Sequence, residues 1–153
     1  TSCNQTIESN TETSVDENQK DTIEYEIPIT FEEDFETEYN LNEWSEFRTL
    51  KYNILVLANS ISGYNDNDAK YLEDVLNKLR NNSREVLKSD FYLFKSSPEI
   101  KGRFKLLDIQ IQKTKNNLSK LNKSDGLEEL NKIFVFYNYS ANMIESILVD
   151  SIN

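Results

Sequence analysis

The stretch SPEIKGRFKLLDIQIQKTKNNLSKL, residues 97–121, decides the fold, because its apolar residues repeat with the period of a packed helix. Spacings that alternate between four and three keep a set of residues on one side of a helix. The repeating positions are Ile100, Phe104, Leu107, Ile111, Thr114, Leu118 and Leu121. Ser97 suits the N-cap and Pro98 the first helical position, so the sequence predicts a helix over residues 98–121. One helix cannot bury such a stripe alone, and we expect the rest of the chain to supply partner helices.

The composition favours an all-α protein, because three glycines and two prolines in 153 residues are too few for a protein rich in tight turns. Similar stripes predict further helices over residues 41–62, 68–88 and 127–152. Asn40 and Glu43 have the spacing of a capping box for the first of them. The stripes are Trp44, Phe47, Leu50, Ile54, Leu57 and Ile61; Leu72, Val75, Leu76, Leu79, Val86 and Leu87; and Leu127, Leu130, Phe134, Tyr137, Ala141, Ile144 and Leu148. The sequence therefore predicts an up-and-down antiparallel four-helix bundle over residues 41–153.

The charge is divided unevenly along the chain. Residues 1–43 hold 13 acidic residues and one basic residue, whereas residues 44–153 hold 14 acidic and 16 basic residues. Binding of nucleic acid needs a basic surface that displaces counterions from the phosphates. A polyanionic segment next to a nearly neutral bundle argues against that, and we expect no nucleic acid partner.

Residues 1–22 are polar and acidic, with too few apolar side chains to offset the entropy lost on ordering, and we expect a disordered tether. The only cysteine of the chain, Cys3, follows Thr1 and Ser2, which resemble the last positions of a bacterial lipobox. This pattern predicts lipid attachment at Cys3; the alternative is an isolated surface thiol. Asn4 is not the acidic residue that retains some lipoproteins in the inner membrane, which favours the outer membrane. No apolar run approaches the roughly 20 residues of a membrane span.

Residues 23–40 alternate large apolar side chains with acids. Ile27-Pro28-Ile29 prevents a continuous helix, so the segment should be extended and then form a short helical turn, with Thr30 as its cap. The apolar residues are Ile23, Tyr25, Ile27, Phe31, Phe35 and Tyr39. They are too many for a linker, and two interpretations stay open: the segment docks on its own bundle, or it binds a partner protein. Under the second, Phe31, Phe35 and Tyr39 are candidate partner contacts.

Two features of the bundle sequence stand apart from the stripes. Residues 90–96 place three aromatic side chains in a connection, where we expect them to plug one end of the bundle. Arg103, one turn into the third helix, is a further candidate partner contact. The alternative is that Arg103 pairs with an acid of a neighbouring helix and lies along apolar surface.

The residue types exclude several kinds of chemistry. The chain has no histidine, which removes histidine-based triads, the ligand pairs of di-iron bundles and an imidazole ligand to haem. There is no glycine-rich phosphate loop, and the single methionine, Met143, lies beside a stripe where packing explains it. We therefore expect a protein that is not an enzyme and that holds no cofactor and no metal.

The order of features resembles the small helical lipoproteins of Flavobacteriia and related Bacteroidetes. An acidic tail leads to an aromatic stretch before a tryptophan, then to S-P-E-I-K-G-R-F-K-L-L, then to a closing helix with N-x-x-x-x-M-I. The matching residues are Phe31, Phe35, Trp44, Pro98, Ile100, Arg103, Phe104 and Leu107. The resemblance implies the fold and an envelope location and supplies no catalytic residue.

Two further details of the sequence bear on the resemblance, one on modification and one on location. Asp21-Thr22-Ile23 resembles the O-glycosylation signal of that phylum, which makes Thr22 a candidate site; Asp150-Ser151-Ile152 has the same form. Residues 4–7 do not match the acidic signal that sends some of these lipoproteins to the cell surface, so we expect the periplasmic side of the outer membrane.

Three functional hypotheses follow. The first is a lipid-anchored envelope protein, not an enzyme, whose bundle scaffolds or recognises another envelope protein. The second is an immunity-type or inhibitor lipoprotein that neutralises a basic toxin with its acidic segment. The third is a carrier of small apolar molecules, which requires a cavity of several hundred cubic ångströms inside the bundle.

Overall fold

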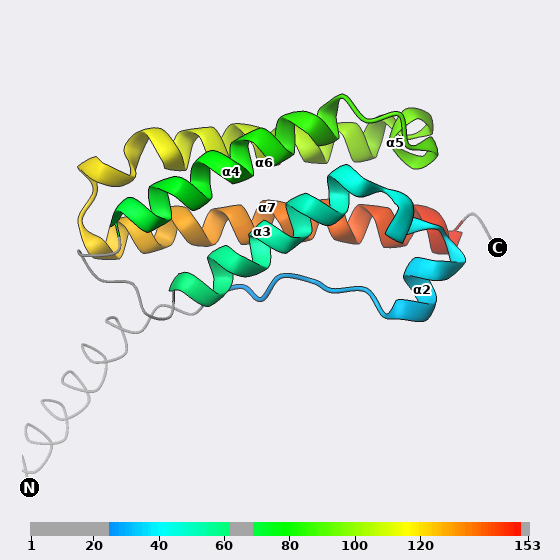
Figure 1. Ribbon diagram of the computed structural model, residues 1–153, viewed down its shortest axis with the longest axis horizontal. Helices are drawn as coiled ribbons and strands as arrows, with labels where there is room; N and C mark the ends of the chain where they lie inside the picture. The colour runs from blue at the N-terminus through cyan, green and yellow to red at the C-terminus, as the bar shows by residue number, and fades with distance from the viewer. Residues whose placement is uncertain (1–24, 62–68, 151–153) are drawn as a thin grey trace, which may run out of the picture.

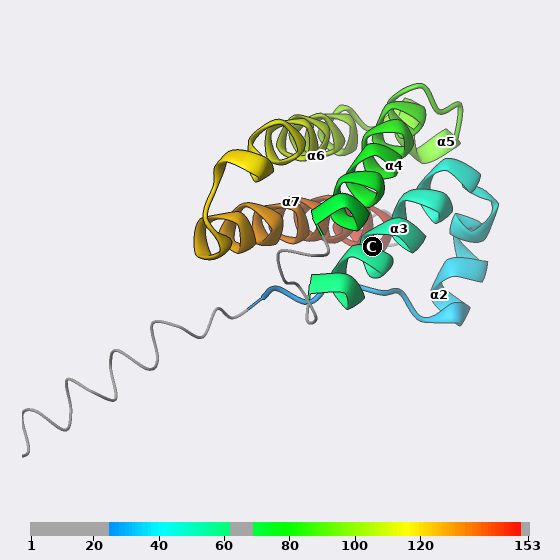
Figure 2. The same ribbon diagram turned by 60° about the vertical axis from the view of Figure 1, so that its left-hand side comes forward.

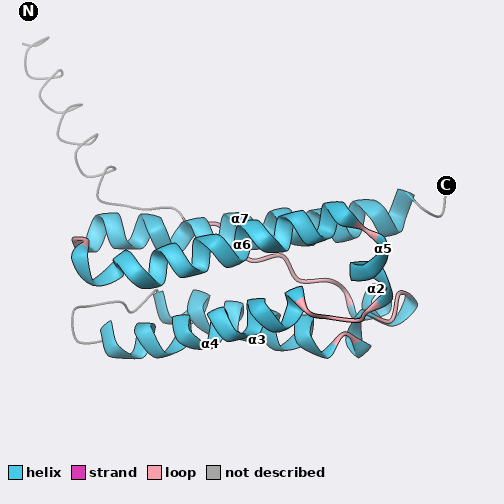
Figure 3. Cartoon of the chain, turned by 90° about the horizontal axis from the view of Figure 1, so that it is seen from above, coloured by secondary structure: helices cyan, strands magenta, loops and turns pink. Residues whose placement is uncertain are grey.

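The computed structural model describes residues 25–61 and 69–150. The predicted tether 1–22, with Cys3 and Thr22, lies outside these residues. Within the described ranges the chain forms helices joined by coil, without a strand, so the prediction of an all-α protein is confirmed (Figure 3). None of these helices combines the length and the apolar composition that a membrane span requires.

Four long helices lie alongside one another. They are α3 (Ser45–Ile61), α4 (Ala69–Leu87), α6 (Pro98–Asn117) and α7 (Lys123–Asp150). The shorter elements are α2 (Glu33–Glu38), η1 (Leu41–Glu43), α5 (Tyr92–Ser96) and η3 (Leu118–Lys120). The helix α4 packs against α3 and α6, and α6 packs against α7. The colours of Figure 1 show that α3 and α6 run in one direction, and α4 and α7 in the other.

The predicted stripes form the core. All six residues of the first stripe are buried, five of them in α3 and Trp44 just before it, as are Ile100, Phe104, Leu107, Ile111 and Thr114 of α6. In α7 the stripe is buried from Leu130 to Leu148, and in α4 from Leu72 to Val86. The predicted stripe residues at the helix ends, Leu87, Leu118, Leu121 and Leu127, are only partly buried. The interior of each stripe was predicted correctly because a helix packed on one side keeps its apolar residues on that side.

The predicted start of the first long helix is wrong. Asn40 adopts a left-handed conformation, with φ of 57°, and its side chain caps nothing. The next three residues form the separate 3-10 turn η1, and α3 begins at Ser45 instead of residue 41. A capping box requires an extended N-cap residue, so the left-handed backbone of Asn40 excludes the predicted pairing with Glu43.

The last helix begins four residues earlier than predicted, at Lys123 instead of residue 127. Asn122 supplies the cap, because its Oδ1 accepts a hydrogen bond of 2.8 Å from the backbone N–H of Asp125. Gly126 therefore lies inside the helix, at a close approach: a Cβ there would lie 3.2 Å from Cδ1 of Leu118. The helix α6 also ends early, at Asn117, and continues into η3.

The start of α6 is confirmed, since Oγ of Ser97 accepts a hydrogen bond of 3.4 Å from the N–H of Ile100. Of the three aromatic residues before it, Phe94 is buried and Phe91 packs against the core, but Tyr92 is exposed, so the prediction that all three plug the end of the bundle holds only in part. Part of that connection is the helix α5. Trp44 stacks on Phe91 with ring centroids 4.8 Å apart, and its Nε1 donates a hydrogen bond of 2.9 Å to Oγ of Ser89.

Candidate functional site

The segment before the first long helix, residues 25–39, lies along the protein's own α3 and α7, and we call it the strap (Figures 1 and 3). Five of its large side chains are partly buried against the core: Tyr25, Ile29, Phe31, Phe35 and Tyr39. Its short helix α2 begins at Glu33, and the preceding residue, Glu32, makes no side-chain cap. Thr30 is therefore not the cap that we predicted.

Two asparagines of α7 hold the backbone of the strap. The N–H of Glu26 donates a hydrogen bond of 2.7 Å to Oδ1 of Asn131. The N–H of Ile29 donates to Oδ1 of Asn138 at 2.8 Å, and Nδ2 of Asn138 donates to the carbonyl oxygen of Ile27 at 2.9 Å. Asn138 is buried, and these bonds satisfy its amide on both sides. We call Asn131 and Asn138 the asparagine pair.

The aromatic rings of the strap continue into the core. Phe31 stacks on Phe35 at 5.1 Å between ring centroids, and Phe35 contacts Tyr39 at 4.9 Å. Phe31 also meets the edge of Phe47 in α3, at 6.5 Å. Phe31, Phe35 and Tyr39, which we predicted as partner contacts, are thus brought together on the protein's own bundle; a role in binding a partner stays a prediction.

A half-buried ion pair ties α2 to α3. Nζ of Lys51 lies 3.1 Å from Oε1 of Glu36, and both side chains are largely shielded from solvent.

The hydroxyl of Tyr137 is buried without a hydrogen-bond partner in the described part of the chain. Burial raises the pKa of Tyr137, and the nearby carboxylate of Glu36 raises it further. This phenol therefore stays protonated and cannot serve as a base at neutral pH.

The strap and the turn η1 that follows it are acidic. Residues 25–43 contain seven acidic residues and no basic residue. Six of the seven are exposed, namely Glu26, Glu32, Glu33, Asp34, Glu38 and Glu43. The asparagine pair and the aromatic contacts hold the strap backbone that carries the first five of these acids. We call this set the acidic ridge.

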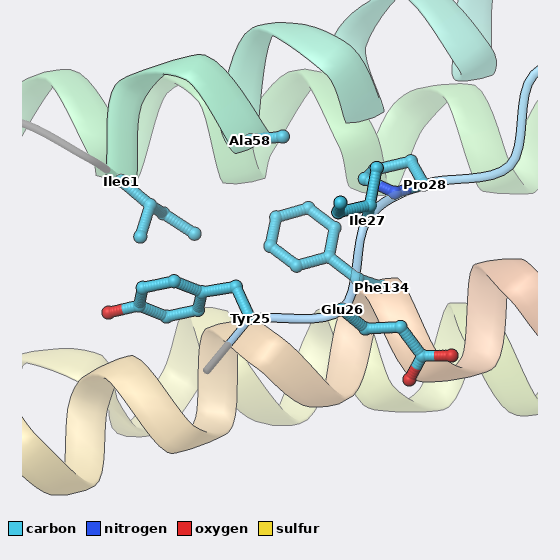
Figure 4. Close-up of a pocket in the computed structure, with 7 residues that line it drawn as sticks. All are labelled: Tyr25, Glu26, Ile27, Pro28, Ala58, Ile61 and Phe134. Carbon is cyan, nitrogen blue, oxygen red and sulfur yellow. The ribbon is translucent and has the colours of Figure 1, made fainter. Parts of the chain in front are cut away.

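A small, mostly apolar cavity lies between the strap, the last turn of α3 and α7 (Figure 4). Its volume is about 210 Å³, and seven residues line it: Tyr25, Glu26, Ile27, Pro28, Ala58, Ile61 and Phe134. Figure 4 shows the rings of Tyr25 and Phe134 and the side chain of Ile61 around one space. Sites for small molecules usually measure about 300–1,000 Å³, so this cavity is small for a ligand site.

Arg103, the other predicted partner contact, lies apart from the strap at the groove between α6 and α7. Its guanidinium lies over the ring of Tyr139, 5.6 Å from the centroid, and forms no ion pair with an acid among the described residues. The predicted pairing with an acid is therefore replaced by a cation–π contact. Together with Asn142, Met143 and Ser146 these two side chains line a shallow hollow of about 250 Å³.

The described residues offer no metal site, because they contain no cluster of three or more side chains that could ligate an ion. Comparison with models of protein families, with curated proteins and with solved structures finds no match to this chain.

Sequence reasoning missed the asparagine pair. The signal was available: Asn131 and Asn138 are seven residues apart in an apolar helix, which places two amides on the same side of it. Side-chain amides aligned in this way can bind an extended backbone, because each offers both a donor and an acceptor.

Proposed function

We propose that this protein is a lipid-anchored envelope protein, not an enzyme, in which an up-and-down four-helix bundle carries the acidic ridge to a basic surface of another envelope protein. The observation that carries the proposal is the docking of the strap. An acidic segment that needed only to be soluble would not require two hydrogen-bonded asparagines and a stack of rings to hold it.

Fixing the ridge favours binding in two ways. The backbone that carries these carboxylates is already held in place, so association does not have to order it and loses less conformational entropy. Acids gathered on one side also steer a basic partner toward that side and reject acidic ones. In this proposal Phe31, Phe35 and Tyr39 act mainly by holding the ridge in place, and Arg103 with Tyr139 offers a separate contact.

The ridge can be tested by reversing charge. Replacing Glu32, Glu33 and Asp34, all exposed, with lysine should abolish recovery of the partner after cross-linking in solubilised envelope, followed by affinity purification and mass spectrometry. The control reverses Glu73, Asp74 and Glu145, three exposed acids on α4 and α7. In the unchanged protein, recovery should fall as salt rises, because exposed charges are screened. Equal recovery with both triple variants would contradict the proposal.

The proposed location rests on Cys3. A lipid there, followed by a tether whose root-mean-square reach is about 25 Å, would hold the bundle clear of the periplasmic side of the outer membrane, with Thr22 available for O-glycosylation. Expressed with its natural upstream sequence, Cys3→Ser should move the protein from the membrane to the soluble periplasmic fraction and remove incorporation of labelled palmitate. Retention in the membrane with undiminished label would refute the lipid site.

The acidic ridge also supports the second hypothesis, an immunity-type lipoprotein. Its partner would be a basic toxin encoded beside this protein, and purified protein should neutralise that toxin in proportion to the dose. The lysine variants of the ridge distinguish a toxin from a structural partner. If the partner is a toxin, the variants should fail to neutralise it, and the toxin should again inhibit growth; a structural partner would give no such effect. The hypothesis of a carrier receives less support, since the strap cavity of about 210 Å³ is small for a ligand.

A further inference from the structure

The helix α6 carries a second stripe on the side that faces away from the core. Glu99, Gly102, Leu106, Ile109 and Lys113 follow one another at spacings of three and four, as the buried stripe does. All five are exposed, and the two apolar members are unusually so, with 43% of Leu106 and 61% of Ile109 accessible to solvent. We call these five residues the outer stripe. In the single chain they contribute nothing to the core.

Within residues 25–61 and 69–150, nothing in the structure accounts for a glycine at position 102. Its backbone is helical without a positive φ, and a Cβ added there would have no heavy atom within 4 Å. A glycine inside a helix is less favourable than alanine and is normally retained where the backbone must turn or where another group approaches closely. The first reason does not apply here, which leaves a close approach by a group outside the described residues, and a second copy of the chain can supply such a group.

The order of the outer stripe makes it complementary to itself. When two copies of α6 are placed antiparallel about a two-fold axis at Leu106, Leu106 meets its own copy. Ile109, a large side chain, then lies opposite Gly102, and Lys113 lies opposite Glu99. Size and charge both match, and each match occurs twice. A parallel pair would instead set Glu99 against Glu99 and Lys113 against Lys113, which is repulsive.

We propose that the outer stripe is a homodimer interface, in which α6 pairs antiparallel with α6 of a second copy. An interface of this kind uses the same residues on both partners and closes after two copies. Figures 1 and 2 show that α6 and the strap lie on opposite sides of the bundle. Dimerisation would therefore leave the acidic ridge of both copies free, and it does not depend on the proposed function.

The composition of the stripe also sets the strength of the association. Only two large apolar side chains from each copy are buried, and the nearby Lys105 brings two like charges together across the axis. Stable interfaces bury about 1,200–2,000 Å² in total, which a single pair of helices with this stripe does not reach. The dimer should dissociate in the micromolar range or above, which makes it concentration-dependent and measurable.

The test is sedimentation equilibrium of the full chain over a concentration series up to about 1 mM, where a dimer of micromolar affinity is well populated, with a reductant present so that Cys3 cannot cross-link two copies. The unchanged protein should show a monomer–dimer equilibrium. Glu99→Lys and Lys113→Glu should each weaken dimerisation at least about tenfold, because each replaces two attractive contacts with two repulsive ones. The double variant, with both changes, should restore it. Glu145→Lys, an exposed reversal on α7, is the control and should have no effect.

The variant Gly102→Ala distinguishes a glycine that a dimer interface requires from a glycine that has no role. It should raise the melting temperature of the dilute monomer by roughly 2–4 °C, since alanine suits the helix better and meets no neighbour. It should also weaken dimerisation, since the added methyl group lies where Ile109 of the other copy must fit. A stripe without a partner would give only the first effect.

Several outcomes would overturn the proposal. One is a monomer at every concentration, and another is a dimer that none of the α6 variants weakens. Failure of the double variant to recover would refute the antiparallel register. Binding to vesicles of anionic phospholipid that requires Leu106 and Ile109, without self-association, would assign the outer stripe to a membrane surface and would equally refute the dimer.

Discussion

Two different kinds of segment pack against the two sides of α7, a helix on one side and an extended strap on the other. On one side α6 packs directly against α7, and a polar cluster joins them: Nε2 of Gln110 donates to Oε2 of Glu129 at 3.0 Å, and Oγ1 of Thr114 donates to the carbonyl oxygen of Glu129 at 3.3 Å. On the side toward α3 the strap lies against the helix, held by the asparagine pair. We call these two regions the helix side and the strap side.

The difference follows from where the backbone N–H and C=O groups of each partner find their hydrogen bonds. A helix satisfies its own N–H and C=O groups, so it needs only a complementary apolar surface from its neighbour. An extended segment has no internal partners for these groups, and those that become buried must find them on the surface that receives it. The strap side therefore needs asparagines at defined positions, whereas the helix side can vary in its polar residues if its packing is kept.

The largest expected effect is on the core residues of α6, the helix that packs against the helix side of α7. Phe104 is fully buried and contacts the rings of Trp44, Phe47 and Phe94. Phe104→Ala should lower the free energy of unfolding by about 3–5 kcal/mol, measured by urea denaturation. The matched control is Leu106→Ala on the same helix, which is exposed and should change the stability of the dilute monomer by less than about 0.5 kcal/mol. Similar losses in both variants would mean that the assigned core is wrong.

The next effect tests the strap side. Asn138→Ala leaves the N–H of Ile29 and the carbonyl oxygen of Ile27 without partners and should cost about 1–3 kcal/mol. Amide hydrogen exchange should accelerate at Ile29, while the amides of α6 keep their protection relative to global unfolding. Asn142→Ala, an exposed asparagine one turn further along α7, should change neither quantity measurably. Unchanged exchange at Ile29 in the Asn138 variant would show that the asparagine pair does not hold the strap.

The same contrast explains which parts of the fold could be predicted from the sequence. The interior of each stripe was predicted, because helices that pack side by side leave the contact as a period in the sequence. Only residues at the stripe ends, such as Leu121 and Leu127, are not fully buried. The strap has no such period. Its docking depends on Asn131 and Asn138, and a single seven-residue spacing is a weaker signal than a stripe of seven apolar residues.

The ends of the helices were predicted less well, for a local reason. Asn40 and Asn122 are both plausible N-cap residues, yet only Asn122 caps a helix, because Asn40 adopts the left-handed backbone. Asparagine tolerates either conformation, and the choice depends on how the chain turns from α2 into α3. Of the candidate site, the sequence predicted the acids and the aromatic rings but not the amides that position them.

The smallest expected effect concerns the polar cluster of the helix side, where a carboxylate carries the contact. Nζ of Lys132 donates to Oε1 of Glu129 at 2.8 Å, and this hydrogen bond lowers the pKa of Glu129 most; Gln110 lowers it further, while burial acts in the opposite direction. A carboxyl group whose pKa is lower in the folded than in the unfolded protein stabilises the fold above its unfolded pKa, about 4.3 for glutamate, and loses that contribution as the pH falls through its folded pKa.

Glu129→Gln should therefore lower the melting temperature slightly at pH 7, by roughly 1–3 °C, and the difference from the unchanged protein should shrink as the pH falls below about 4. Thermal melts followed by circular dichroism between pH 3 and pH 7 measure both. Glu128→Gln, the exposed neighbour, is the control and should leave the profile unchanged. A loss of stability in Glu129→Gln that is equal at all pH values would show that the shape of the side chain matters and its charge does not. The helix side would then depend on packing alone, and the contrast with the asparagine pair would be sharper than we infer.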